Sequence, residues 1–213
     1  MPLIHELESE NKEVLRTSAR ILGKIGDPKA APDLAKLLDH PDLKIRGAAC
    51  TSLGQVGDTA FLEVVVSVFS DSVETVRKSA AYALGELKTP GGIPALISAF
   101  EDPHYSVRLT AVSSLAEIGE LAADTLIVLL DHPDLGVQNL SIEALGKIKC
   151  SRAVDPLLSK LDSEYWTTRA FAVEALGEIG DKRGIVAVVN LQEKETHPFV
   201  LNRISYVLEK IKE

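Results

Sequence analysis

A repeating pattern constrains the fold of this chain more than any other feature. The segment LLDHPDL occurs at 37–43 and again, unchanged, at 129–135. The sequence around it recurs as well, because RILGKIGD at 20–27 returns as TSLGQVGD at 51–58 and as EALGEIGD at 174–181. Self-similarity at such a period indicates a stack of small structural units rather than one central core.

Aligned on its Leu-Gly pair, the pattern occurs seven times, at intervals of 30 to 32 residues. The anchor positions are Gly23, Gly54, Gly85, Ala116, Gly146, Gly177 and Glu209. The predicted repeats are approximately 1–26, 27–57, 58–88, 89–119, 120–150, 151–180 and 181–213. We expect them to form one continuous domain over 1–213, because a two-helix unit of about 31 residues cannot bury its own apolar face alone.

Each repeat carries two helical patterns. The first is short and apolar, as in AAPDLAKLLDH at 30–40, and the second follows a turn, as in VRKSAAYALGEL at 76–87. An anchor glycine costs about 1 kcal/mol of helix propensity, so its recurrence predicts a helix crossing where a Cβ atom would collide. The sequence therefore predicts an all-α fold, a right-handed α-solenoid of seven two-helix repeats.

Glycine and aspartate mark the predicted helix ends. Gly26, Gly57, Gly119 and Gly180 are expected to end second helices as left-handed residues. Aspartates are expected to form turns and cap the helices that follow. They are Asp27, Asp58 and Asp181 after second helices, and Asp39, Asp71, Asp102, Asp131 and Asp162 after first helices.

The pattern V-R-x-x-A-x-x-A-L-G-x-I-G-D, followed by a short helix with A-x-P-x-L, resembles HEAT repeats, specifically the HEAT-like repeats of the phycobilisome-lyase type. Its arginine column is carried by Arg46, Arg77, Arg108 and Arg169. Leu15, Gln138 and Leu201 depart from it. Gln138 either weakens the stack locally or is a neutral substitution. The resemblance implies the fold and leaves the function open.

Composition excludes several classes of partner. The net charge of −8 argues against nucleic acid, which needs a basic footprint. No apolar run approaches the roughly 20 residues of a membrane helix, and the N-terminal segment has no signal-peptide pattern. Cys50 and Cys150 are too few for a disulfide framework. We expect a cytoplasmic monomer that binds neither nucleic acid nor membranes.

The sequence contains few of the motifs that catalytic sites need. The resembling class includes a di-iron hydroxylase built from His-Glu pairs, and the only such pair here is His5-Glu6. His40 and His132 are three repeats apart and are expected to lie roughly 25–30 Å from each other. No phosphate loop or nucleophile motif is present. We predict no metal, no cofactor and no catalytic residue. The alternative is a subunit of a phycobilin lyase or isomerase, because some members of the resembling class attach or isomerise bilin chromophores.

A protein-binding surface is the favoured function. The resemblance implies that the second helices line a concave face, and the positions opposite their buried stripe would bind a partner protein or peptide. These residues are Arg16, Arg20, Tyr82, Leu109, Glu117, Leu140, Glu143, Phe171, Glu174, Glu178 and Tyr206. Leu140 and Phe171 would alternatively pack sideways on the next repeat. Tyr105 and Trp166 are candidates for the rim, or would cover the end of the preceding helix.

Overall fold

The computed structural model describes residues 2–211, and every regular element in that range is a helix. The chain divides into two compact units, unit 1 up to Ile118 and unit 2 from Gly119. The prediction of helix pairs throughout the chain is confirmed within each unit. The single continuous domain over 1–213 stays a prediction.

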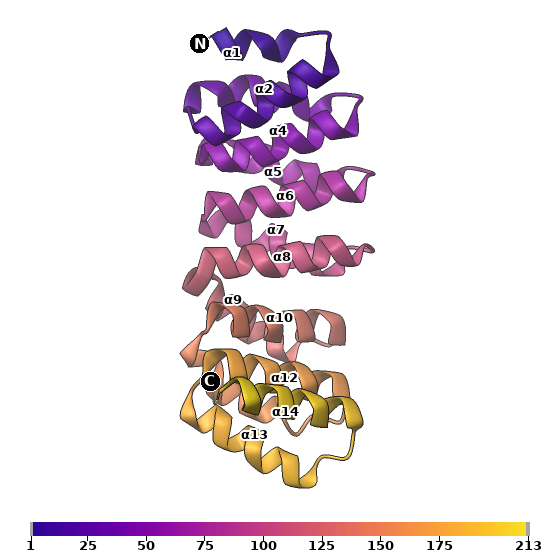
Figure 1. The fold of residues 1–213 in the computed structure, drawn as a ribbon, viewed down its shortest axis with the longest axis vertical. Helices are drawn as coiled ribbons and strands as arrows, with labels where there is room; N and C mark the ends of the chain where they lie inside the picture. The colour runs from indigo at the N-terminus through magenta and orange to yellow at the C-terminus, as the bar shows by residue number, and fades with distance from the viewer. Residues whose placement is uncertain (1, 212–213) are drawn as a thin grey trace. The chain divides into compact units, whose positions relative to one another are not determined.

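In unit 1 the second helices lie side by side in one layer, and the first helices form another layer beside it (Figure 1). The second helices are α2 (Lys12–Ile25), α4 (Leu43–Val56), α6 (Glu74–Leu87) and α8 (Tyr105–Ile118). The first helices are α1 (Pro2–His5), α3 (Ala31–Lys36), α5 (Leu62–Ser67) and α7 (Ile93–Ser98). Leu22, Leu53, Leu84 and Leu115, one residue before each anchor, are buried, so the core lies between the layers.

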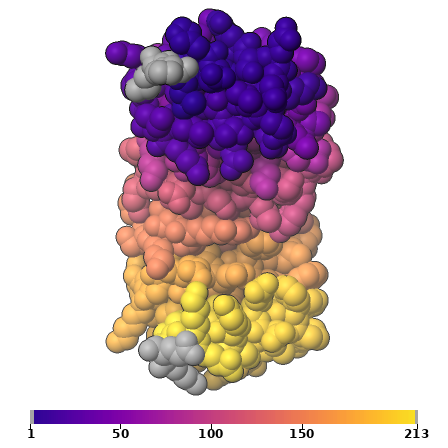
Figure 2. Space-filling model, turned by 45° about the horizontal axis from the view of Figure 1, so that its top comes forward, coloured from indigo at the N-terminus to yellow at the C-terminus, as the bar shows by residue number. Residues whose placement is uncertain are grey.

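Unit 2 repeats the arrangement. Its second helices are α10 (Leu135–Ile148), α12 (Trp166–Ile179) and α14 (Pro198–Lys210), and its first helices are α9 (Ala123–Val128), α11 (Val154–Lys160) and α13 (Lys182–Lys194). In both units, successive repeats form successive bands of surface (Figure 2). Each repeat therefore exposes its own side chains next to those of its sequence neighbours.

The first helices are shorter than the sequence pattern predicts. The segment 30–40 forms α3 flanked by 3₁₀ turns instead of one α-helix. Such turns often tighten the ends of short helices. The 3₁₀ segments are Glu6–Glu8, Pro28–Ala30, Leu37–Asp39, Thr59–Phe61, Val68–Ser70, Pro90–Gly92, Ala99–Glu101, Gly119–Ala122, Leu129–Asp131 and Ser151–Ala153.

The predicted glycine ends are confirmed. Gly26, Gly57, Gly119 and Gly180 have φ values of 71°, 76°, 75° and 72°. At the corresponding positions of two other repeats, Lys88 and Lys149 adopt the same left-handed conformation, which is strained for a residue with a side chain. A lysine at these positions still satisfies the end of the helix through its backbone N–H.

The predicted aspartate caps divide into two groups. Asp27, Asp58 and Asp181 are N-caps whose carboxylates accept backbone N–H bonds two residues on. Of the aspartates after first helices, Asp71 and Asp102 instead accept the N–H of a residue still in the turn, Val73 or His104. The N-caps of α4 and α10 are Asp42 and Asp134, three residues after Asp39 and Asp131. The cap prediction was therefore wrong by three residues in these repeats.

The anchor glycines lie where neighbouring second helices cross. A Cβ on Gly54 would lie 2.5 Å from the Cα of Ala83, and one on Gly146 would lie 2.7 Å from the Cα of Ala175. Because these neighbours are backbone atoms, they cannot move aside cheaply. The predicted reason for the glycine column, a collision with any Cβ, is confirmed.

Three members of the arginine column, Arg46, Arg77 and Arg169, tie their turn to the turn of the next repeat. Arg77 donates from Nε and Nη2 to the two carboxylate oxygens of Asp102, at 2.7 and 3.0 Å, and from Nη1 to the carbonyl of Asp71 at 2.9 Å. Arg46 holds Asp71 in the same way. These bonds hold the pKa of both carboxyls below the usual range of aspartate. The column thus has a structural role.

Candidate functional site

The solvent-facing side of the second helices of unit 1, here called the unit 1 face, contains a basic hollow of about 420 Å³. The hollow spans α2, α4 and the first two turns of α6. It is lined by Arg16, Arg20, Leu43, Lys44, Gly47, Ala48, Thr51, Thr75 and Ser79. Its lining contains three cations and three hydroxyl groups and no carboxylate, so it offers hydrogen-bond donors to an anion.

Helix caps fix the backbone from which the cations of the hollow project. Asn11 caps α2 by accepting the backbone N–H of Glu13 at 3.0 Å, and Asp42 caps α4 by accepting that of Lys44 at 3.0 Å. Both cap residues are extended, as an N-cap requires. Arg16 and Arg20 then point along one face of α2, because residues four apart are neighbours on a helix.

Two of the predicted residues of unit 1 lie in the hollow and three lie outside its lining. Arg16 and Arg20 line it. Tyr82 is 40 % exposed, and partial burial together with the neighbouring Glu86 carboxylate raises the pKa of its phenol. Leu109 is half-buried. Glu117 is exposed and pairs with Lys88 at 3.2 Å.

Sequence reasoning missed Lys44 and Thr75 as members of the hollow. Both lie ten residues before their anchor glycines. The predicted binding positions, such as those of Arg16 and Arg20, lie seven and three residues before the anchor, so Lys44 and Thr75 precede them by about one helical turn. Extending the predicted face by one turn toward the N-termini of α4 and α6 would have included them.

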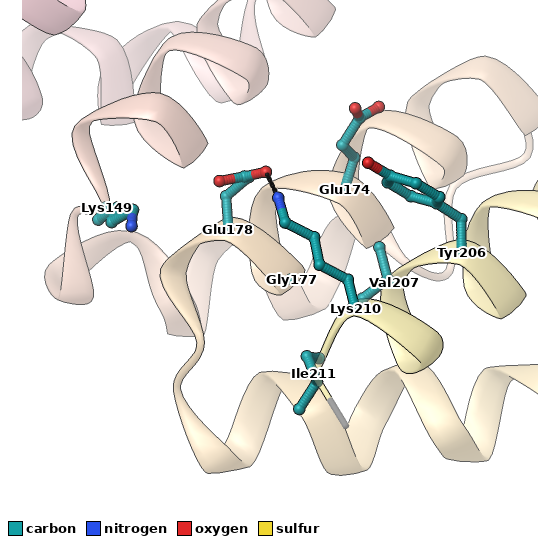
Figure 3. Close-up of a pocket in the computed structure, with 8 residues that line it drawn as sticks. All are labelled: Lys149, Glu174, Gly177, Glu178, Tyr206, Val207, Lys210 and Ile211. Atoms are coloured by element: carbon teal, nitrogen blue, oxygen red, sulfur yellow. Dashed lines mark hydrogen bonds and ion pairs between the residues drawn. The ribbon is translucent and has the colours of Figure 1, made fainter. Parts of the chain in front are cut away.

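The corresponding side of unit 2 carries a smaller hollow of about 190 Å³ between α12 and α14. Figure 3 shows Glu174 and Tyr206 on the same side of it, and Glu178 facing Lys210. Lys210 binds Glu178 at 2.6 Å, and Arg203 lies 3.8 Å from Glu174. Glu143 pairs with Lys147 at 3.3 Å. The predicted binding carboxylates Glu143, Glu174 and Glu178 are thus largely neutralised by neighbouring cations, while Tyr206 is 53 % exposed.

The two apolar side chains predicted for the face of unit 2 differ in outcome. Leu140 is only 6 % exposed, so a partner cannot reach it, and the prediction that it anchors a partner was wrong. Phe171 is half-buried and keeps part of its ring at the surface. Both lie at the border of the buried stripe, where the approach of a neighbouring helix decides exposure.

A buried polar contact in unit 2 was also missed. Thr168 takes the place of an apolar residue and donates to the Oδ1 atom of Asn139 at 2.9 Å. Neither residue is accessible, since Thr168 is fully buried and Asn139 is 9 % exposed. Next to Asn139, Gln138 replaces the arginine of the column, and Ser163 occupies the position 25 residues on, where Asp71 and Asp102 follow Arg46 and Arg77.

The rim candidates have different surroundings. Tyr105, at the start of α8, is 60 % exposed, and the guanidinium of Arg108 lies 5.3 Å from its ring centre. Trp166, at the start of α12, stacks on His197 with ring centres 4.4 Å apart, and Phe199 meets it edge-on at 5.2 Å. This aromatic cluster joins α12 to the start of α14 in the following repeat, not to the end of the preceding helix, and Trp166 is still 39 % exposed. Its role at the rim therefore stays a prediction.

Residues 2–211 offer few side chains for metal binding or nucleophilic catalysis. That range contains no group of three or more His, Cys, Asp or Glu side chains able to hold a metal ion. Burial raises the pKa of the Cys50 thiol to about 12, so it stays protonated at neutral pH. Cys150 is buried beside Glu120. No helix in the described range is long and apolar enough to cross a membrane.

The helix pairs repeat about every 31 residues, cross at glycines and are linked by arginines of one column. These features define an α-helical repeat protein. A sequence profile of HEAT repeats matches residues 1–85, 62–134 and 123–209. The chain therefore belongs to the HEAT-repeat family, and the predicted membership is confirmed.

The chain is also similar to several known proteins. It is 39 % identical over 72 residues to the phycocyanobilin lyase subunit beta of Pseudanabaena tenuis (strain PCC 7409), a match covering 34 % of this chain and 25 % of the relative. The archaeal HEAT-like repeats protein of Thermococcus onnurineus NA1 matches with a TM-score of 0.58 and 19 % identity, over 99 % of this chain and 96 % of that one.

A chain of the CpcE–CpcF complex of phycocyanin lyase from Nostoc sp. PCC7120 matches with a TM-score of 0.57 and 20 % identity, over 98 % and 93 %. At such identities the two structural likenesses show the fold alone.

Proposed function

We propose that this chain is a non-catalytic scaffold, a cytoplasmic monomer that binds a segment of a partner protein on its second-helix side. The observation that carries the proposal is the basic hollow of the unit 1 face, with cations and hydroxyl groups around a floor of small residues. Tyr82 is exposed on α6, whose first turns border the hollow. A partly exposed aromatic ring near charged groups is typical of protein-binding surfaces.

The rigid support of this surface favours the binding of a partner. The backbone of α4 is held by its N-cap, by the glycine crossing with α6 and by the bond between Arg46 and Asp71. A preorganised surface loses little conformational freedom when a partner binds, and this improves affinity. The Nostoc lyase chain occurs in a complex with a second protein, which supports a protein partner for this chain as well.

Photo-crosslinking tests the proposal. A benzophenone side chain at position 82 should give a discrete covalent adduct in an extract of the source organism. The same side chain at Val64, which is 37 % exposed on α5 of the other layer, is the matched control. An adduct from position 82 alone would support a partner on the second-helix side. Identical adducts from both positions, or none from position 82, would contradict it.

A second candidate is a role as a phycobilin lyase or isomerase subunit, favoured by the 39 % identity to a phycocyanobilin lyase subunit. A bilin carries propionate carboxylates that Arg16 and Arg20 would pair with. Adding phycocyanobilin to the purified chain tests this reading by visible absorption. A shifted, chiral absorption band that is lost in Arg16→Ala/Arg20→Ala would favour it, and the spectrum of free bilin would exclude it.

A further inference from the structure

Small side chains create the basic hollow at one repeat. Gly47 and Ala48, on α4, form part of its lining. At the position of Gly47, the neighbouring repeats carry Arg16 and Lys78, and the other repeats carry Leu, Asn or Ala. At the position of Ala48, other repeats carry residues as large as Phe171. The hollow therefore results from one repeat with little side-chain volume between two repeats with cations.

The cations around the hollow are poorly neutralised. No carboxylate of residues 2–211 lies within 4.0 Å of the charged nitrogens of Arg20, Lys44 or Lys78. Arg16 binds Glu13 through Nη2 at 2.6 Å, and its buried Nε atom has no hydrogen-bond partner in the described part of the chain. On a chain with a net charge of −8, this is a local exception that attracts negative charge.

The cations of α2 also have a regular spacing. Arg16, Arg20 and Lys24 follow one another at four-residue intervals, and Arg20 and Lys24 also line an adjoining hollow with Thr17 and Ile21. Residues four apart on a helix are separated by about 6 Å along its axis. In an extended peptide, every second residue lies on the same side, with a spacing of about 6.6 Å. The two spacings match over a few residues.

We propose that the unit 1 face binds an acidic, extended segment of a partner protein, with alternate Asp or Glu side chains on Arg16, Arg20 and Lys24 and its backbone over Gly47 and Ala48. This inference rests on the proposed scaffold function and specifies its partner. Lys24 lies in the last turn of α2, so the row of cations ends there and the acidic stretch is short. Glu86 and Glu117 occupy the position of Lys24 two and three repeats on, and they would repel an acidic segment that ran across the second helices instead of along α2. A nucleic acid needs a longer row of phosphate contacts than this face offers.

Fluorescence anisotropy with the full chain tests the proposal, using a labelled peptide of alternating Glu and Ser as the probe and its Gln–Ser counterpart as the uncharged control. The double variant Arg20→Ala/Lys24→Ala should weaken binding at least about tenfold, since two of the three proposed charge contacts are lost. The matched control Lys29→Ala/Lys182→Ala removes two exposed lysines outside the hollow, and it should bind like the wild type. Circular dichroism verifies that each variant is folded.

A second variant separates the hollow from general charge attraction. Ala48→Phe fills the hollow and keeps every charge, and phenylalanine is accepted at this helix position in Phe171. The proposal predicts that it also weakens binding about tenfold. Equal binding of the Ala48→Phe variant and the wild type would overturn the proposal, as would equal losses in the two lysine-containing double variants. Equal binding of a single-stranded DNA oligonucleotide at matched charge would overturn the choice of a peptide.

The scaffold function and this inference can fail separately. A crosslinked partner from position 82 without binding of the acidic peptide would leave the scaffold function standing and overturn the acidic partner. The absence of both a crosslinked partner and peptide binding would overturn both.

Discussion

At the scale of single residues, buried ion pairs hold the turns between repeats. The carboxylate of Asp102 is 8 % exposed and that of Glu195 is 2 % exposed, and each binds both arms of an arginine. A buried pair contributes little net stability when compared with apolar residues, but removing one partner is costly because it leaves the other charge buried. The arginine column therefore makes the repeats depend on one another.

Arg77 and Arg108 allow a matched test of this dependence. Arg77→Ala strands the buried carboxylate of Asp102 and should lower the free energy of unfolding by roughly 3 kcal/mol. Among the described residues of unit 1, Arg108 makes no ion pair, and its guanidinium donates only to the carbonyls of Asp102 and Pro103. Arg108→Ala should therefore cost only about 1 kcal/mol. Urea unfolding of the two variants measures the loss of unfolding free energy. Equal losses would contradict the inference that the ion pair with Asp102 makes Arg77 the more important residue.

Glu195 makes the stability of unit 2 depend on pH. The bonds from Arg169 and the backbone N–H groups of Thr196 and His197 lower its pKa from 4.5 to about 2. Because the folded pKa lies below the unfolded one, the stabilisation is complete above about pH 5 and is lost as the pH falls toward 2. Glu195→Gln should cost about 3 kcal/mol at pH 7 and less than half of that near pH 3.

Chemical denaturation of wild type and Glu195→Gln at the two pH values measures this difference. Arg183, an exposed arginine paired with Asp155 and Asp181, supplies the control, because Arg183→Gln should show a small effect at either pH. A cost of Glu195→Gln that did not change with pH would show that the ion pair is not its source.

At the scale of helices, the distance between neighbouring second helices depends on the anchor glycines. Gly54→Ala places a methyl group 2.5 Å from the backbone of Ala83, so overpacking should destabilise the protein by about 2–3 kcal/mol. Gly47 lies on the same helix, and a Cβ there would meet only the Ser79 hydroxyl, at 3.3 Å. Gly47→Ala should be neutral or stabilising by up to about 1 kcal/mol. Thermal melts of both variants measure the change in melting temperature. A stabilised Gly54→Ala protein would contradict the inference that the crossing leaves no room for a Cβ atom.

At the scale of the whole molecule, stability is expected to be local. In a stack of repeats each unit contacts only its neighbours, so a defect weakens nearby helices most. In hydrogen exchange on the full chain, Gly54→Ala should therefore accelerate exchange in α4 and α6 more than in α12 and α14. Uniform acceleration throughout the chain would instead indicate a single cooperative core.

Periodicity by itself determined much of this protein. It specified the helix pairs, the left-handed ends at Gly26, Gly57, Gly119 and Gly180, and the crossings at the anchor glycines. These features follow from local rules, because a backbone that needs positive φ or a missing Cβ selects glycine at that residue whatever the rest of the chain does. The family also followed from the repeated motif.

Only the tertiary structure decided which side chains are available to a partner. The sequence placed Leu140 and Tyr82 on one predicted face, yet Leu140 is buried and Tyr82 is exposed. It also did not show that Arg77 binds an aspartate 25 residues away, or that Lys44 joins Arg16 and Arg20 around Gly47 and Ala48. Exposure and pairing depend on how closely neighbouring helices approach and on the volume of the side chains between them, and these distances exist only once the repeats are stacked.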